Sequence, residues 1–294
     1  MSPRQRRAFL PCLVAGLLAL MPGCGEQQHG TLANPLEAFN FTLESREPTV
    51  QVSLLDRLGY EGMALFWPGA ETFEAFTAAP AVRGGTFRMR AVLLDFHFEP
   101  AWSRVEVDAL LATLAPHGTD LWLILGDPAS QHEARVTAVR ELTSMATARG
   151  VRVVVYPHFG TGVPTVEDAL VLIDAVSLPE LTASLHLCHE LKAGNRDRLT
   201  EVIARAAPRI TLASIHGASR DTSAPGWATT IMPLDRGDLD VQNAYLLPLA
   251  RAGYSGPLLL HTFGIEEPPE EHFRRSRDAW LGMEREVAAT LAPP

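Results

Sequence analysis

The stretch that decides the fold of this chain is Val153-Val154-Val155-Tyr156-Pro157-His158. A short apolar run of this kind is typical of a buried β-strand, and here it ends in a histidine. Four other apolar runs also end in a histidine, over residues 92–97, 181–186, 210–216 and 258–261. Because each run is followed by a segment with helical spacing, the pattern predicts repeated strand–helix units and a parallel sheet.

Eight such units follow one another from residue 38, and eight units close a (β/α)8 barrel. The predicted strands cover residues 39–43, 63–67, 88–97, 121–125, 152–156, 181–188, 210–215 and 257–260. The predicted helices include residues 104–114, 131–149, 197–206 and 241–252, and a long loop over residues 217–240 precedes the last of them. We therefore expect an α/β fold, a TIM barrel with a single domain over residues 38–290.

The N-terminus has the pattern of a secretory signal peptide over residues 1–23. Arginines precede an apolar stretch that runs from Ala8 to Leu20. This stretch is too short to span a bilayer as a stable helix, so the pattern predicts export and not a membrane-spanning segment.

The end of this segment, Leu20-Met21-Pro22-Gly23-Cys24, is similar to a bacterial lipobox, although Met21 and Pro22 depart from the usual residues. The resemblance implies lipidation of Cys24 and a lipoprotein on the periplasmic face of a membrane. Residues 24–37 would then be a polar tether. The alternative is cleavage without lipidation and release into the periplasm or medium.

The chain carries a net charge of −9, and removal of the arginine-containing signal peptide makes the balance more negative. Such a chain has no electrostatic attraction to nucleic acid or to anionic lipid. We therefore expect no nucleic-acid partner, and membrane contact only through the lipid anchor.

In a (β/α) barrel the carboxyl ends of the strands meet on one face, where active sites are built. The five strand-end histidines would therefore lie near one another. Imidazole binds divalent transition metals and titrates near neutral pH, so the cluster indicates metal-assisted chemistry or proton transfer. The alternative is that each histidine is only a polar residue where the chain leaves the core.

Several segments, in this order around a barrel, resemble the xylose isomerase-like TIM barrels, the superfamily of sugar phosphate isomerases and epimerases. These segments are residues 55–62, 156–158, 186–189, 233–240 and 252–257. The resemblance implies a small carbohydrate substrate and a divalent metal held by residues at the ends of the fifth to eighth strands.

The metal-binding positions of that family fall here on Tyr156, on His186 with His189, on His216 and on His261. The two glutamates of the family are replaced, one by Tyr156 and the other by His261. Either the metal site is rebuilt from His186, His189, His216 and His261, or the barrel no longer performs that isomerisation. Imidazoles suit Zn, Mn, Fe or Co, whereas Mg and Ca prefer oxygen ligands.

Proton transfer is assigned to His158, His261 or Glu190, with Tyr156 as a hydrogen-bond donor to a substrate oxygen. Candidate substrate-binding residues are Lys192, Arg220, Trp67 and His97, the last of these paired with Asp95 on the same side of its strand. A solvated surface charge is the alternative for Lys192 and Arg220. Trp227 is a candidate lid residue in the long loop.

The leading hypothesis is an exported enzyme of the sugar isomerase/epimerase type that removes a proton next to a carbonyl with the help of a metal. A lyase or hydratase that acts on 3-keto-glycosides would use the same chemistry. The other class is a non-catalytic carbohydrate-binding barrel that has lost the metal-binding glutamates. An apurinic endonuclease is disfavoured by the acidic balance and the export signal.

Overall fold

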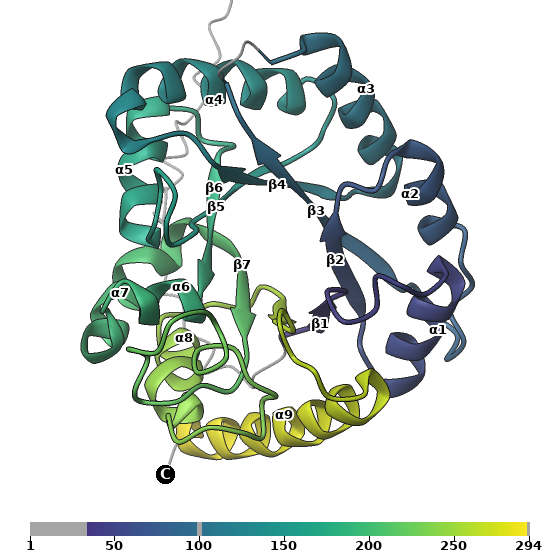
Figure 1. Ribbon diagram of the computed structural model, residues 1–294, viewed down its shortest axis with the longest axis vertical. Helices are drawn as coiled ribbons and strands as arrows, with labels where there is room; N and C mark the ends of the chain where they lie inside the picture. Colours follow the sequence, from purple (N-terminus) through teal and green to yellow (C-terminus); the bar gives the residue numbers. More distant parts are fainter. Residues whose placement is uncertain (1–33, 99–101, 293–294) are drawn as a thin grey trace, which may run out of the picture.

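The computed structural model describes residues 34–98 and 102–292, and these form one closed barrel of eight parallel strands (Figure 1). Each strand pairs with the next along the chain, and β8 pairs with β1 to close the barrel. The strands are β1 (Leu36–Phe39), β2 (Gly62–Phe66), β3 (Arg88–Phe96), β4 (Asp120–Leu125), β5 (Val153–Tyr156), β6 (Thr182–His186), β7 (Ile210–Ile215) and β8 (Leu258–Leu260). The predicted single-domain TIM barrel is confirmed.

The helices form a ring outside the strands (Figure 1). The α-helices are α1 (Pro48–Leu58), α2 (Ala70–Thr77), α3 (Arg104–Leu114), α4 (His132–Thr147), α5 (Val166–Val176), α6 (Leu187–Lys192), α7 (Leu199–Ala206), α8 (Leu247–Arg251) and α9 (Pro269–Leu291). Short 3-10 turns are η1 (Ala115–His117), η2 (Ala129–Gln131), η3 (Arg196–Arg198) and η4 (Ala207–Arg209), and η5 (Gln242–Leu246) is a π-helix. No helix in the described part of the chain is long and apolar enough to cross a membrane.

Side-chain caps fix where two of these helices begin. Thr165 accepts a hydrogen bond from the backbone N–H of Asp168, and the Asp168 carboxylate accepts one from the backbone of Thr165. This reciprocal pair satisfies amides that α5 cannot satisfy itself. The Ser103 side chain caps α3 by accepting the backbone N–H of Glu106.

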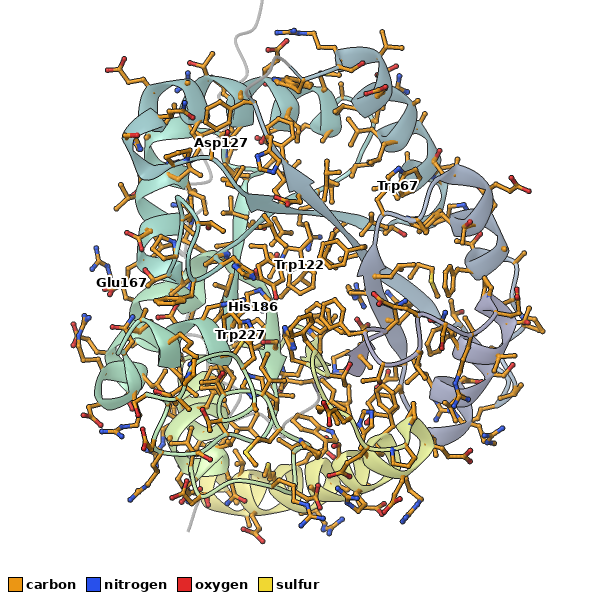
Figure 2. The ribbon with its side chains drawn as sticks, viewed as in Figure 1. Trp67, Trp122, Asp127, Glu167, His186 and Trp227 are labelled. Atoms are coloured by element: carbon orange, nitrogen blue, oxygen red, sulfur yellow. The ribbon has the colours of Figure 1, made fainter. Side chains whose placement is uncertain are left out.

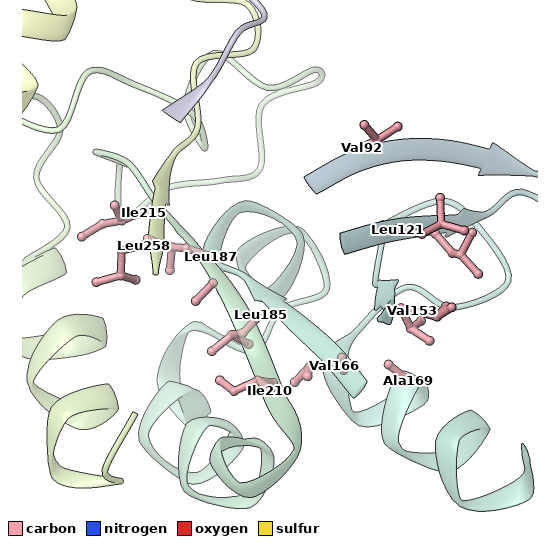
Figure 3. Packing of buried hydrophobic residues seen from close by; sticks show 14 of the residues in the cluster. Val92, Leu121, Val153, Val166, Ala169, Leu185, Leu187, Ile210, Ile215 and Leu258 are labelled. Carbon is pink, nitrogen blue, oxygen red and sulfur yellow. The ribbon is translucent and has the colours of Figure 1, made fainter. Parts of the chain in front are cut away.

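The apolar core has two layers, one between the strands and the helices and one inside the barrel. Figure 3 shows part of the outer layer, in which Leu185 of β6 and Ile210 of β7 lie among the buried residues near the helices. The inner layer is built from residues of alternate register on the strands, among them Phe39, Leu93, Trp122 and Tyr156. Because neighbouring residues of a strand point to opposite faces, each strand supplies both layers.

Among the element boundaries that differ from the sequence expectation are those of β1 and β6. β1 begins at Leu36, because residues 36–38 pair with β8, so the expected tether over residues 24–37 includes the first residues of the barrel. β6 ends at His186, and the chain turns at once into α6, which carries Cys188 and His189. The predicted signal peptide and Cys24 lie outside the described residues.

Candidate functional site

A cavity of about 100 Å³ lies at the carboxyl ends of the strands. It is lined by Phe41, Phe66, Leu93, Ile124, Tyr156, His158, His189, Trp227, Ile231, His261 and Phe263. These residues come from strand ends and loops all around the barrel, which is where (β/α)8 barrels place their binding sites. Of the five strand-end histidines, His158 and His261 line this cavity, together with His189 of α6.

One wall of the cavity is polar. Tyr156 ends β5, His158 follows it, and His189 lies in α6. The rings of His158 and His189 have their centroids 4.3 Å apart, and His189 meets Tyr156 edge to face at 5.6 Å. Trp227, from the long loop after β7, packs edge-on against His189 at 5.1 Å.

The opposite wall is aromatic and apolar. Phe41 follows β1, Phe66 ends β2 and Phe263 follows β8, and these three strands are neighbours in the barrel. The ring of Phe41 lies 5.9 Å from that of Phe66 and 5.7 Å from that of Phe263, so the three form one aromatic surface. We call Phe41, Phe66 and Phe263 the phenylalanine wall.

His261 joins the two walls. Its Nε2 lies 3.3 Å from the Tyr156 hydroxyl, and its ring packs 5.2 Å from Phe41. The backbone N–H of Phe263 donates to His261 Nδ1, so the proton of the neutral ring is on Nε2. Nε2–H therefore donates to Tyr156, and the hydroxyl proton of Tyr156 remains available to a ligand.

Backbone contacts fix the tautomers of the other two lining imidazoles. His158 Nδ1 lies 2.9 Å from the carbonyl oxygen of Phe159 and donates to it, which leaves a lone pair on Nε2. His189 Nδ1 accepts the backbone N–H of Phe159 at 3.2 Å, so His189 carries its proton on Nε2. This buried Nε2–H has no hydrogen-bond partner in the structure. The cavity therefore offers donors on Tyr156 and His189 and an acceptor on His158.

Burial keeps these groups uncharged at neutral pH. It lowers the pKa of His158, and it lowers the pKa of His189 and His261 well below the usual histidine value, with neighbouring imidazoles adding to the effect. Burial also raises the pKa of the Tyr156 phenol well above its ordinary value. No charged side chain lines the cavity within the described part of the chain. The site is therefore electrically neutral.

His186 lies beneath the cavity as a buried structural residue, near Trp122 at the centre of the barrel (Figure 2). Ser184 donates to the carbonyl of Val155, so its oxygen accepts the Nε2–H of His186 at 2.8 Å. Ser214 then donates to His186 Nδ1 at 3.1 Å. Both ring nitrogens are therefore used within the protein.

The predicted ligand set of His186, His189, His216 and His261 does not fit a metal in this arrangement. A metal needs a ring nitrogen with a free lone pair. The hydrogen bonds described above leave no such nitrogen on His186, His189 or His261. His216 Nδ1 donates to the carbonyl of Gly217, and its buried Nε2 is the single free lone pair of the four. No group of three His, Cys, Asp or Glu side chains in residues 34–98 and 102–292 is placed to hold a metal ion. The predicted metal site thus stays a prediction that these contacts do not support.

Glu190, predicted as an acid or base, is not in the cavity. Its carboxylate accepts the backbone N–H of Val166 at 2.7 Å and the side-chain amide of Asn195 at 2.6 Å. The group is fully buried, and burial raises its pKa. Glu190 ties α6 to the start of α5, so its position corrects the expected catalytic placement.

Lys192 and Arg220 do not reach the cavity either. The Lys192 ammonium donates to the carbonyls of Thr222 and Ala224, which fastens the loop of residues 217–240 to α6. Arg220 is an exposed residue of this loop. The loop also folds on itself through a bridge between Gly217 and Met232. A Cβ at Gly217 would collide with the carbonyl oxygens of Pro233 and Arg236, so glycine is needed there.

Trp67 and His97 lie together, but in a different cavity. They line a groove of about 590 Å³ that also includes residues of α3, and Figure 2 places Trp67 near α2, away from His186. His97 Nε2 is 3.3 Å from Asp95 in this groove, as its position on the strand predicts. Neither residue lines the imidazole cavity, because Trp67 points outward from the barrel where Phe66 points inward.

Sequence reasoning missed most of the apolar lining. Phe41 and Phe263 lie two residues beyond Phe39 and His261, on the same side of the chain as these inward-pointing rings. That two-residue spacing was the available signal. No sequence signal identified Ile231 as a lining residue, because only the folding of the long loop brings it to the cavity.

Comparison with known proteins places this fold in context. The profile of the family described as xylose isomerase-like TIM barrel matches residues 113–282, more than half of the chain. No curated protein is similar enough in sequence to count as a relative.

Solved structures match over most of the chain. A probable 3-DHS dehydratase of petrobactin synthesis from Bacillus anthracis has a TM-score of 0.69 at 14% identity, covering 84% of this chain and 98% of its own. A 3-keto-D-glucoside 4-epimerase from E. coli has a TM-score of 0.64 at 14% sequence identity, and the match covers 86% of this chain and 99% of the epimerase chain. D-Psicose 3-epimerase with D-tagatose from Clostridium cellulolyticum H10 has a TM-score of 0.65 at 15% sequence identity, and the match covers 86% of this chain and 99% of the epimerase chain.

These structural neighbours include sugar epimerases and a dehydratase, and at such identities they show the shared fold alone. The family profile, the closed eight-stranded barrel and the site at its carboxyl end agree with one another. The chain belongs to the xylose isomerase-like TIM barrel family.

Proposed function

We propose that the cavity at the barrel mouth binds one small neutral carbohydrate ring. The observation that carries this proposal is the division of an uncharged cavity into two walls. Imidazole and phenol groups lie on one side, and the phenylalanine wall lies on the other. A sugar ring has hydroxyls around its edge and C–H groups on its faces, so it complements both walls.

The hydrogen-bonding groups suit hydroxyls in particular. A hydroxyl both donates and accepts, and the cavity offers the donors Tyr156 Oη–H and His189 Nε2–H beside the acceptor His158 Nε2. A ligand oxygen at His189 would also satisfy a buried N–H that has no partner in the protein. An unpaired buried donor costs about 1–3 kcal/mol, so its satisfaction favours binding.

Size and charge narrow the ligand class. The cavity of about 100 Å³ is smaller than the roughly 300–1,000 Å³ of pockets for drug-sized ligands, which favours a single ring. A phosphate group would meet no cationic side chain in the cavity lining. The ligand class is therefore a free sugar or a simple glycoside, and not a sugar phosphate.

The metal-assisted mechanism implied by the family resemblance is not part of this proposal. Transition-metal ligation would require His186 and His261 to give up hydrogen bonds to Ser214 and Phe263. The alternative of a carbohydrate-binding barrel without the family's glutamates needs no such rearrangement. It is the function that the geometry supports best.

A second candidate is proton transfer without a metal, and the free lone pair of His158 favours it. In a bound keto-sugar, His158 Nε2 would accept the proton of the carbon next to the carbonyl. Tyr156 would donate a hydrogen bond to the carbonyl oxygen as negative charge develops there. Epimerisation, isomerisation and elimination of a 3-keto-glycoside all begin with this step. It is recognised by exchange of that carbon-bound proton with deuterated solvent.

We also propose, from the sequence of residues 1–24, that the protein is exported and lipidated on Cys24. Metabolic labelling with a radioactive fatty acid tests this. Label should enter the wild-type protein and not Cys24→Ala, whereas equal labelling or none in both proteins contradicts lipidation.

The binding proposal is tested by calorimetric titration of the purified protein with neutral aldoses, ketoses and methyl glycosides, and with the matching sugar phosphates. At least one neutral sugar should bind, and its phosphate should bind at least tenfold more weakly. Tyr156→Phe should weaken binding about tenfold, which corresponds to the loss of one hydrogen bond. The exposed substitution Arg220→Met is the control and should leave the affinity within twofold.

Failure of every neutral sugar to bind, or tighter binding of the phosphates, would overturn the proposal. For the second candidate, deuterium should enter a bound keto-sugar with the wild-type protein and not with His158→Gln. If a keto-sugar binds and no deuterium enters it, the protein binds carbohydrate without proton transfer, and the second candidate is wrong.

A further inference from the structure

The phenylalanine wall extends beyond the cavity. Phe66 and Phe263 line the cavity, yet their surfaces remain 42% and 48% exposed. They come from β2 and from the segment after β8, on either side of Phe41, which follows β1, so the exposed parts belong to one continuous aromatic surface at the mouth. Large exposed apolar surfaces that adjoin a pocket mark binding sites.

A sugar ring alone would leave this surface uncovered. The cavity has room for a single small ring, and its polar groups lie on the opposite wall, on Tyr156, His158 and His189. A ring held by these groups leaves the outer parts of Phe66 and Phe263 in water. An apolar substituent on the sugar, directed toward the mouth, would cover them.

The absence of charge in the cavity lining also favours an apolar substituent on the sugar. The cavity lining has no charged side chain within the described residues, so no group there favours a charged substituent over an apolar one. Trp227 of the long loop packs against His158 and His189 and adds apolar surface on the side opposite the phenylalanine wall. An apolar substituent would therefore contact hydrophobic side chains on both sides as it leaves the cavity.

We propose that the natural ligand is a glycoside with an aromatic or similarly apolar aglycone, whose sugar ring occupies the cavity and whose aglycone packs on Phe66 and Phe263. This inference rests on the proposed carbohydrate binding and names the ligand class of that same site. The aglycone contributes affinity by removing apolar surface from water, and the sugar contributes orientation through hydrogen bonds.

The test compares phenyl and methyl β-glycosides of D-glucose, D-galactose and D-xylose by calorimetric titration. The phenyl glycoside of the sugar that binds should bind at least tenfold more tightly than its methyl glycoside. In the variant Phe66→Ala/Phe263→Ala this ratio should fall to threefold or less. Phe66→Leu, which keeps an apolar side chain, should retain most of the ratio.

The matched control is Val171→Ala, which removes an apolar side chain that is 56% exposed on α5, outside the lining of the cavity. It should leave the ratio unchanged. The thermal midpoint of each variant shows that it is folded, and the ratio of phenyl to methyl glycoside affinity in the wild-type protein still tests the proposal if the double variant does not fold.

The outcomes separate the two proposals. If neither glycoside of any sugar binds, the proposed carbohydrate binding is wrong and this inference falls with it. If both glycosides bind with equal affinity, or if the ratio survives the double substitution, sugar binding stands and the aglycone site is wrong. Equal binding of phenol without a sugar would also contradict the inference, because the ring would then not need the carbohydrate.

Discussion

The rings of Tyr156 and His186 stack with their centroids 3.7 Å apart and their planes 19° from parallel. Tyr156 lines the cavity from above this stack, and His186 supports it from below. With its two serine hydrogen bonds, His186 fixes the floor of the site and does not take part in its chemistry.

Replacement of His186 by phenylalanine should therefore affect stability more than binding. His186→Phe keeps the stacked ring but leaves the buried Ser214 hydroxyl without this partner. We expect the free energy of unfolding to fall by about 1–3 kcal/mol, measured by urea denaturation. Sugar affinity should change less than threefold, and a complete loss of binding in a folded variant would contradict the supporting role.

Metal removal should leave the function intact. The tautomers of His189 and His261 place protons on the nitrogens that a metal would need. We expect the purified protein to contain well under one transition metal per chain by elemental analysis, and sugar affinity to stay within twofold after dialysis against EDTA. Stoichiometric zinc, iron, cobalt or manganese, with binding lost on its removal and restored on its return, would show that the imidazoles rearrange around an ion.

Acidification should destabilise the protein through its buried imidazoles. Burial lowers the pKa of His216 to about 4, below the value of about 6.5 expected in the unfolded chain. Between these values the unfolded chain binds more protons, so the stability contributed by neutral His216 is complete above pH 6.5 and is lost as the pH falls toward 4.

His216→Asn isolates this effect, because asparagine does not titrate and can still donate near Gly217. Between pH 7.5 and 4.5 the wild-type protein should lose about 2 kcal/mol more unfolding free energy than the variant, measured by urea denaturation at each pH. Groups that are not coupled to His216, such as Asp120, whose pKa burial raises to about 6, act equally in both proteins and cancel in the difference. Parallel curves for the two proteins would refute the assignment to His216.

Lys192 should control the loop that carries Trp227. It is the only lysine of the chain, and its ammonium donates to two loop carbonyls. Lys192→Met keeps the apolar stem and removes both bonds, so we expect chymotrypsin to cleave within residues 217–240 roughly tenfold faster. Sugar binding should weaken as Trp227 loses its position over His189. The control variant Arg220→Met, in the same loop, should be cleaved at the wild-type rate. An unchanged cleavage rate in Lys192→Met would show that other contacts hold the loop.

The sequence predicted the architecture because local patterns carry it. The apolar runs and the helical spacing between them gave the eight units, and the third helix and the seventh strand have the predicted bounds, 104–114 and 210–215. The sequence also located the cavity, because the ends of parallel strands in a closed barrel must meet on one face. His158, His189 and His261 lie there for that reason.

The sequence alone determined the barrel and the face that carries the site, since strand alternation and helical periodicity are properties of neighbouring residues. Only the tertiary structure decided the role of each histidine, because a role depends on partners far apart in the chain. Ser214 forms a hydrogen bond with His186 Nδ1, and the backbone N–H of Phe159 sets the tautomer of His189. The turn into α6 places Glu190 against Val166 and away from the cavity. Hydrogen bonds between distant segments thus determined which imidazoles keep a free nitrogen, and with it what the site can bind.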